Sequence, residues 1–173
     1  MLLILDVDGV LTDGKKYYDN TGKGIYKTFC DRDFTAIKKF KAAEWNVVFL
    51  SGDKNVNEAV AMNRKIPFYC NRENGVMVDK AEFLPIFEKT YNCDPDNMVY
   101  VGDDVFDVNI MKNVGYAFCP ENAALEVKLV AESLLVEGGN NCISCLYDRL
   151  VYLELVSPVT IRQIMDLDLN ERF

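Results

Sequence analysis

The sequence predicts an α/β fold built on a doubly wound parallel sheet. Short apolar runs, each long enough for one buried strand, alternate along the chain with segments of helical periodicity. This alternation favours a parallel sheet with helices on both faces, because each crossover between parallel strands needs a long connection. The chain has 173 residues, of which 50% are hydrophobic, and is therefore long enough to bury the core of one domain.

The expected elements follow one another in regular order. Apolar runs predict strands over 3–5, 47–50, 67–70, 98–101, 116–118 and 134–136. Apolar residues at helical spacing predict helices over 31–43, 55–64, 80–91, 105–113, 123–131 and 142–155, the third of them with Asp79 as its N-cap. Before the first helix, aromatic residues on either side of a turn cluster predict a β-hairpin over about 15–29.

The chain is expected to divide into one domain over 1–156 and a helical tail over 157–173. Ser157 and Pro158 resemble an N-cap and a first-turn proline, which predicts a terminal helix from there to about Met165. Neither an internal repeat nor a low-complexity linker interrupts the domain.

The charge balance limits the partners that the protein can have. Lys and Arg number 19 against 27 Asp and Glu, which gives a net charge of −8. A surface for nucleic acid or for an anionic membrane needs clustered positive charge, so we expect neither partner. No apolar run approaches the roughly 20 residues of a membrane-spanning helix. The five apolar residues before Asp6 are too few for the core of a signal peptide.

Cysteine and histidine usage narrow the chemistry. The six cysteines lack the density of a disulfide scaffold, which predicts reduced thiols and a cytoplasmic protein. Cys142 and Cys145 have Cys-x-x-Cys spacing but no second pair to complete a zinc site, so we interpret them as structural thiols. The absence of histidine excludes His-dependent triads, His-bound zinc and His bases. Catalysis would then depend on other side chains, with a metal that prefers oxygen ligands.

Polar side chains stand where three of the predicted strands end. Asp6 and Asp8 follow the first strand, Ser51 the second and Asp103 the fourth. On its own, the segment Asp6–Gly9 is equally a strand end followed by an Asx-type turn. In a doubly wound sheet, however, ligands bind beyond the carboxyl ends of the strands, where the strand order reverses. If the first and fourth strands flank that point, Asp6, Asp8 and Asp103 converge into an oxygen-ligand site that suits Mg²⁺.

A phosphate group is the natural companion of such a magnesium site. Ser51 can supply a hydroxyl and backbone N–H groups, and Lys80 adds positive charge at a predicted helix N-terminus. A metal, a carboxylate nucleophile and a cationic clamp together indicate phosphoryl transfer through an aspartyl-phosphate.

These residues resemble, in order, the four motifs of the haloacid dehalogenase superfamily, in its phosphatase branch. The motifs are Asp6-x-Asp8-Gly-Val, Ser51, Lys80 and Gly-Asp103-Asp104-x-x-Asp107, spread over about the first 140 residues. The chain is most similar to the capless, tetrameric phosphatases of 3-deoxy-octulosonate 8-phosphate type. The resemblance implies a Rossmann-like fold with a β-hairpin flap after the first strand and no large cap domain.

The resemblance also implies catalytic roles. Asp6 would be the nucleophile, and Asp8 would be the acid that protonates the leaving alcohol and the base that activates water. Ser51, Gly52 and Lys80 would bind the phosphoryl group, and Lys80 would in addition neutralise the aspartates.

For the metal, the resemblance implies Mg²⁺ held by Asp6, by the backbone carbonyl of Asp8 and by Asp103. Asp104 or Asp107 would help directly or from the outer shell. Thr12 and Arg32 are further candidates for substrate binding. Arg32 could instead contact a neighbouring subunit, or it could form an ion pair with Asp33 at a helix start.

The identity of the substrate stays open at this point. Asp53 and Lys54 follow Gly52, where the octulosonate enzymes often carry Arg. The resemblance therefore implies a small sugar-acid phosphate, either a 3-deoxy-octulosonate 8-phosphate or a nonulosonate 9-phosphate.

The resemblance implies a homotetramer in which neighbouring subunits cover each site, since the gaps between motifs are too short for a large cap. Tyr17, Tyr18 and Tyr26 on the hairpin would suit such an interface. The alternative is a hairpin that folds onto its own domain. The rival function is a non-catalytic tetramerisation module, related to the capless domain of nucleotide-sugar (CMP-sialate) synthetases. An assembly module has no reason to retain the complete carboxylate, Ser and Lys set.

Overall fold

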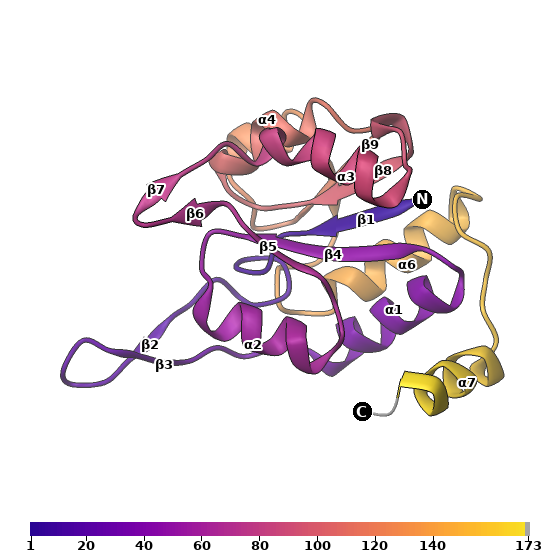
Figure 1. The fold of residues 1–173 in the computed structure, drawn as a ribbon, viewed down its shortest axis with the longest axis horizontal. Helices are drawn as coiled ribbons and strands as arrows, with labels where there is room; N and C mark the ends of the chain where they lie inside the picture. Colours follow the sequence, from indigo (N-terminus) through magenta and orange to yellow (C-terminus); the bar gives the residue numbers. More distant parts are fainter. Residues whose placement is uncertain (172–173) are drawn as a thin grey trace.

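The central sheet follows the predicted doubly wound arrangement. The computed structural model describes residues 1–171, so Arg172 and Phe173 of the predicted tail lie outside the described residues. Within that range, six parallel strands form one sheet in the order β10-β9-β8-β1-β4-β5 (Figure 1). The strands are β1 (Leu2–Leu5), β4 (Asn46–Ser51), β5 (Phe68–Cys70), β8 (Met98–Val101), β9 (Tyr116–Pro120) and β10 (Glu132–Leu134).

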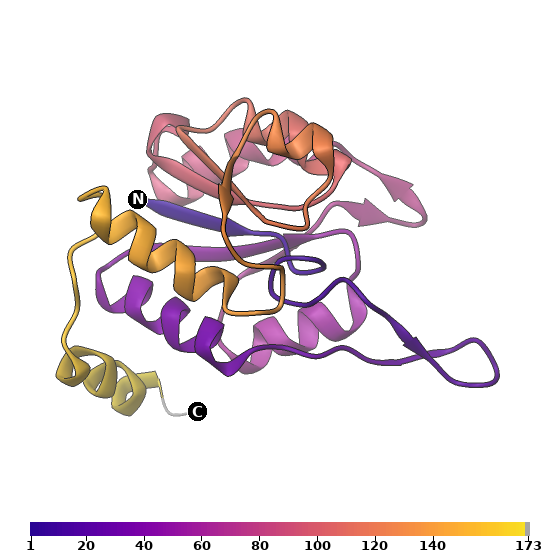
Figure 2. The same ribbon diagram turned by 180° about the vertical axis from the view of Figure 1, so that it is seen from behind.

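Helices cover both faces of the sheet (Figures 1 and 2). One face carries α1 (Asp31–Ala42), α2 (Asn55–Asn63) and α6 (Cys142–Tyr152), and the other carries α3 (Leu84–Tyr91), α4 (Val108–Met111) and α5 (Leu125–Lys128). Alternate residues of β1 point to opposite faces, so that Leu3 and Leu5 join the first core and Leu2 and Ile4 the second. Because β1 is buried on both faces, all of its residues are apolar and do not alternate with polar ones.

The strand order reverses beside β1. From β1 the chain moves outward through β4 to β5, then crosses back to β8 on the other side of β1. Leu5 pairs with Phe49 of β4 and with Val101 of β8, so the carboxyl ends of these strands meet at one edge of the sheet. The predicted switch point between the first and fourth predicted strands is confirmed.

Several predicted elements differ from those observed. The predicted helix over 80–91 starts as a 3-10 turn, η1 (Lys80–Phe83), and becomes α-helical only at α3, whose first turn contains a proline without an N–H donor. Similarly, η3 (Val105–Asp107) precedes α4, and the helix expected over 123–131 is reduced to α5. The last strand lies at 132–134 instead of 134–136.

Two hairpins project from the carboxyl edge of the sheet (Figure 1). The first, β2 (Tyr17–Tyr18) with β3 (Gly24–Tyr26), is the predicted flap. The second, β6 (Arg72–Glu73) with β7 (Val76–Met77), was not predicted. Its turn residues Asn74 and Gly75 both have positive φ angles, of 50° and 81°. An Asn-Gly pair is the strongest short-range hairpin signal, so this element could have been found from the sequence.

The tail helix starts later than predicted. Helix α7 (Ile161–Glu171) begins after Thr160, whose Oγ1 accepts the Gln163 N–H while Gln163 Oε1 accepts the Thr160 N–H, a reciprocal cap. The prediction that Ser157 and Pro158 open this helix is wrong, because the capping pair lies further along. Helix α7 lies outside α1 as an extra layer, and Asp168 forms an ion pair with Lys38 at 2.7 Å. None of the helices within residues 1–171 combines the length and the hydropathy needed to cross a membrane.

Asp33 joins the two largest helices on one face of the sheet. It lies in the first turn of α1 and is almost fully buried. Its Oδ1 accepts the N–H groups of Ile143 at 2.8 Å and Ser144 at 3.0 Å. These donors lie in the first turn of α6, where N–H groups have no acceptor within the helix. Asp33 therefore caps a helix 110 residues away in the sequence instead of pairing with Arg32.

We expect Asp33→Ala to lower the free energy of unfolding by about 1–3 kcal/mol, because two buried N–H donors lose their acceptor. Urea denaturation measures the change. Asp31→Ala is the matched control, since Asp31 lies in the same turn but is exposed, and it should change stability by less than about 0.5 kcal/mol. Equal losses in the two variants would contradict this role for Asp33.

Candidate active site

Asp6 stands at the floor of the site, directly after β1. The residue is 7% exposed, and both of its carboxylate oxygens are held. Oδ1 accepts the Val7 N–H at 2.7 Å, and Oδ2 accepts a hydrogen bond from Lys80 Nζ at 2.7 Å. The orientation of this carboxylate is therefore set by the protein before any ligand binds.

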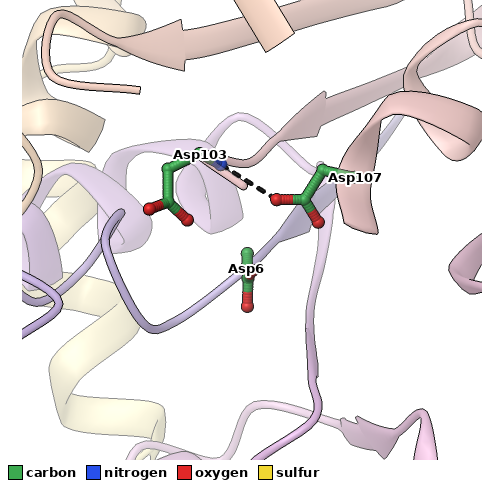
Figure 3. Close-up of side chains that lie close together, drawn as sticks. All are labelled: Asp6, Asp103 and Asp107. Carbon is green, nitrogen blue, oxygen red and sulfur yellow. Dashed lines mark hydrogen bonds between the residues drawn. The ribbon is translucent and has the colours of Figure 1, made fainter. Parts of the chain in front are cut away.

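Asp6, Asp103 and Asp107 form an acidic cluster (Figure 3). One carboxylate oxygen from each lies within 4.8 Å of the others. Asp107 is fully buried, and its Oδ1 accepts hydrogen bonds from Lys80 Nζ and the Tyr100 hydroxyl, both at 2.6 Å. Its Oδ2 accepts the N–H groups of Asp103 at 2.9 Å and Asp104 at 3.0 Å. Asp107 thus positions the loop after β8, which suits a role in the outer shell of a metal.

The cluster holds more negative charge than Lys80 can balance. Burial, together with Asp6 and Asp107, raises the pKa of Asp103 to about 8. Burial also raises the pKa of Asp6 to about 7, against the opposing effect of Lys80. Although burial lowers the pKa of Lys80, the two ion pairs raise it above its usual value, so the ammonium stays charged. Crowded carboxylates without His or Cys are the donor set of a hard divalent cation, and these residues fit Mg²⁺.

The loop after β1 is shaped to let this cluster form. Gly9 has a φ of 79°, and a Cβ there would collide with the Asp103 carboxylate. The Thr12 side chain is fully buried, and its Oγ1 accepts the N–H groups of Gly9 and Gly14, both at 3.3 Å. Thr12 therefore stabilises the loop and is not among the described residues that line the cavity.

The Asp8 side chain turns away from the acidic cluster. Its Oδ1 forms an ion pair with Lys27 Nζ at 2.6 Å, and its Oδ2 accepts a hydrogen bond from Asn57 Nδ2 at 3.0 Å. The predicted convergence of the Asp6, Asp8 and Asp103 carboxylates is therefore corrected, because Asp107 takes the place of Asp8. The strand ends at Leu5 and the chain coils at once, with several N–H groups donating to Val7 O, so alternate residues no longer share a face.

A second polar network connects Asp8 to the phosphate-binding candidate Ser51. Asn57 is fully buried, and its Nδ2 also donates to Ser51 Oγ at 3.0 Å while its Oδ1 accepts from Lys27 Nζ at 3.0 Å. Lys27 reaches Asp53 as well, at 2.9 Å, and Lys16 pairs with Asp53 at 3.0 Å. The base of the flap is thus joined to the site. Lys27 and Asn57 were not predicted as site residues, because they belong to no motif and carry no local signal of burial.

A cavity of about 900 Å³ lies at the strand ends and is lined in part by residues of both hairpins. Its described lining includes most of the predicted site residues, namely Asp6, Asp8, Ser51, Gly52, Lys80, Asp103 and Asp104. Asp104 is exposed, and its carboxylate caps η3 by accepting the Val105 N–H at 2.7 Å. Arg32 is exposed on α1 and is not among the described residues that line the cavity.

Comparisons with known proteins agree with this geometry. The sequence pattern described as haloacid dehalogenase-like hydrolase matches residues 57–143. The 3-deoxy-D-manno-octulosonate 8-phosphate phosphatase of Haemophilus influenzae is 30% identical over 167 residues, which are 91% of this chain and 86% of that protein. The chain belongs to the haloacid dehalogenase-like hydrolases.

Other members of the family show the same likeness. The enzyme of the same name from Salmonella typhi is 34% identical over 124 residues, which cover 70% of this chain and 63% of that protein. The cobalt-bound structure of the Haemophilus influenzae phosphatase matches with a TM-score of 0.78 and 28% identity, over 87% of this chain and 86% of that one. The predicted family, fold and enzyme class, a phosphatase without a large cap domain, are confirmed.

Cation binding at the acidic cluster should compete with protons. Because the pKa values of Asp6 and Asp103 are raised to about 7 and about 8, both groups hold protons at pH 6 and must release them to a cation. We expect the affinity for Mg²⁺ to rise at least about tenfold from pH 6 to pH 8. Titration calorimetry of the metal-free protein measures both the affinity and the protons released. Asp103→Asn removes one carboxylate of the cluster and serves as the control. A pH-independent affinity would contradict a metal site at this cluster.

Proposed function

We propose that the protein is a Mg²⁺-dependent phosphomonoester hydrolase that acts on a 3-deoxy-octulosonate 8-phosphate through an aspartyl-phosphate. The observation that carries this proposal is the Asp6 carboxylate, held by Val7 N–H and Lys80 at the floor of the cavity. Its position at the switch point of the sheet is where such folds bind ligands. The names of the relatives that are 30–34% identical support the substrate class.

In this mechanism the two aspartates after β1 have different tasks. Asp6 attacks phosphorus, and the bond from phosphorus to the ester oxygen breaks while Asp8 donates a proton to that oxygen. Asp8 then accepts a proton from water, and the resulting hydroxide attacks the aspartyl-phosphate to release inorganic phosphate and free Asp6. To donate that proton, Asp8 has to carry it on one carboxyl oxygen, which then gives up its contact with Lys27 or Asn57. The other oxygen would keep its partner and hold the side chain in place.

Ser51, Gly52 and Lys80 would bind the phosphoryl oxygens. Ser51 Oγ already accepts hydrogen bonds from Asn57 Nδ2 at 3.0 Å and from the Asp53 N–H at 3.2 Å. With its acceptor capacity used, the hydroxyl has its own proton left to donate to the phosphoryl group. The surroundings of Ser51 thus favour a donor role.

The metal would be held by Asp6 and Asp103, with the Asp8 backbone carbonyl as the family implies, and Asp107 in the outer shell. A bound Mg²⁺ would supply positive charge that lets an anionic phosphate approach the carboxylates. The solved cobalt-bound relative supports a divalent metal in this family.

A nonulosonate 9-phosphate stays the second substrate candidate, because Asp53 stands where the octulosonate enzymes often carry Arg and is itself paired with Lys16 and Lys27. The tetramerisation module is disfavoured, since every catalytic residue type is retained. Because Arg32 is exposed outside the cavity, we propose contact with a neighbouring subunit as its role.

We further propose a homotetramer whose flaps meet at the subunit interface, with a catalytic domain over 1–156 and a tail over 157–173. Tyr17 and Tyr26 stack with ring centroids 4.7 Å apart, and with Tyr18 they form an exposed aromatic surface on the flap. The six free cysteines are those of a protein in a reducing compartment, which supports a cytoplasmic location.

Phosphate release from 3-deoxy-D-manno-octulosonate 8-phosphate, with and without Mg²⁺, tests the function. We expect release only with Mg²⁺, and a loss of at least about a thousandfold in kcat for Asp6→Asn, which removes the nucleophile. Asp13→Asn is the matched control, since Asp13 lies in the same loop but is not among the described cavity residues. Activity that survives in Asp6→Asn would rule out the mechanism. Absence of release from this compound and from a nonulosonate 9-phosphate would favour the assembly module.

Light scattering on a sizing column tests the tetramer, whose mass should be four times the 19.7 kDa of one chain. The double variant Tyr18→Ser with Tyr26→Ser should dissociate the tetramer, because the interface loses its aromatic contacts. Tyr152→Ser is the control. Tyr152 is exposed at the end of α6, so this variant should leave the mass unchanged. A monomeric unaltered chain would contradict the proposal.

A further inference from the structure

Asn71 is held rigidly at the carboxyl end of β5. It is 2% exposed, and its N–H donates to Ser51 O at 3.3 Å. Its own carbonyl accepts the Val78 N–H at 2.8 Å, and its side-chain Nδ2 donates to Val78 O at 2.9 Å. The Val78 carbonyl oxygen can only accept a hydrogen bond, so it must face the Nδ2 of Asn71 and not the Oδ1. This contact therefore fixes the orientation of the Asn71 side-chain amide.

The other end of that amide has no partner. Among the described residues, no hydrogen bond reaches the buried Asn71 Oδ1. This oxygen lies beside Gly52, 3.3 Å from the position that a Cβ on Gly52 would take, and both residues line the cavity. Buried acceptors are almost always satisfied in native proteins, so an unpaired one in a cavity wall indicates a donor from the ligand.

The chemistry of that donor is restricted. A phosphoryl dianion has only acceptor oxygens, so the phosphate itself cannot satisfy Asn71 Oδ1. Gly52 is a proposed phosphate-binding residue, which places the missing donor close to the phosphate ester. A hydroxyl on the carbon next to the esterified carbon meets both conditions.

We propose that Asn71 is a specificity-determining residue that accepts a hydrogen bond from this neighbouring hydroxyl, so that the enzyme selects polyol phosphates over simple alkyl phosphates. The inference rests on the proposed phosphatase function and extends it. An octulosonate 8-phosphate carries such a hydroxyl at C7, and a nonulosonate 9-phosphate carries one at C8. A site built to bond a hydroxyl rejects the analogue that lacks it, since the buried polar group is then left unpaired.

Two small probes that differ only in this hydroxyl test the proposal. These are sn-glycerol 3-phosphate and the monophosphate of propane-1,3-diol, each assayed with Mg²⁺. We expect kcat/KM of the unaltered enzyme to favour glycerol phosphate at least about tenfold. Asn71→Ala should bring the ratio close to one. Glu73→Ala is the matched control, because Glu73 lies exposed on the same hairpin and outside the described cavity lining, and it should keep the ratio.

A ratio close to one in the unaltered enzyme overturns the proposal even if Asn71→Ala does not fold. An unchanged ratio in a folded Asn71→Ala variant also overturns it. If neither probe releases phosphate, the calorimetric affinities of the two probes decide, and phosphate release from 3-deoxy-D-manno-octulosonate 8-phosphate shows separately whether the proposed function holds. A preference for glycerol phosphate that Asn71→Ala removes supports the inference, and equal affinities refute it.

Discussion

The ion pairs of Lys80 are the interaction on which the rest of the site depends. Its ammonium group lies between the carboxylates of Asp6, at 2.7 Å, and Asp107, at 2.6 Å, and all three residues are buried. A buried lysine without such partners would tend to lose its charge, and each carboxylate without the lysine would be an uncompensated buried charge. The three residues come from the end of β1, the start of η1 and the turn after β8. The ion pairs therefore join three separate segments at the switch point of the sheet.

Two polar networks meet at the loop after β1 without merging. Asp6 faces Lys80 and the acidic cluster, whereas Asp8 faces Lys27 and Asn57. The coiled turn that starts at Val7 separates them, although only one residue lies between the two aspartates. Different surroundings are what allow neighbouring carboxylates to take different chemical roles, so this separation supports the different roles proposed for the two aspartates.

The two hairpins compensate in part for the absence of a large cap. Both the flap β2–β3 and the hairpin β6–β7 contribute residues to the lining of the cavity, and a polar residue links each of them to a segment of the proposed site. Lys27 connects the flap to Asp8, and Asn71 connects the base of the second hairpin to the loop of Ser51. Substrate selection can thus be built into short insertions while the parallel sheet stays unchanged.

The sequence by itself determined the α/β class, the alternation of strands and helices, and the residues Asp6, Ser51, Lys80 and Asp103, because apolar runs and strand-end polar residues are local patterns. Helix continuity was less predictable. Asp79 and Asp104 cap η1 and η3 through local hydrogen bonds, but a cap marks only where a helical segment starts and not whether its first turn is 3-10 or α-helical. Only the tertiary structure decided that Asp107 instead of Asp8 completes the acidic cluster, and that Lys27 and Asn57 hold Asp8. These contacts join residues that lie far apart in the chain, and periodicity within one segment carries no information about which distant side chain will fill the space beside it.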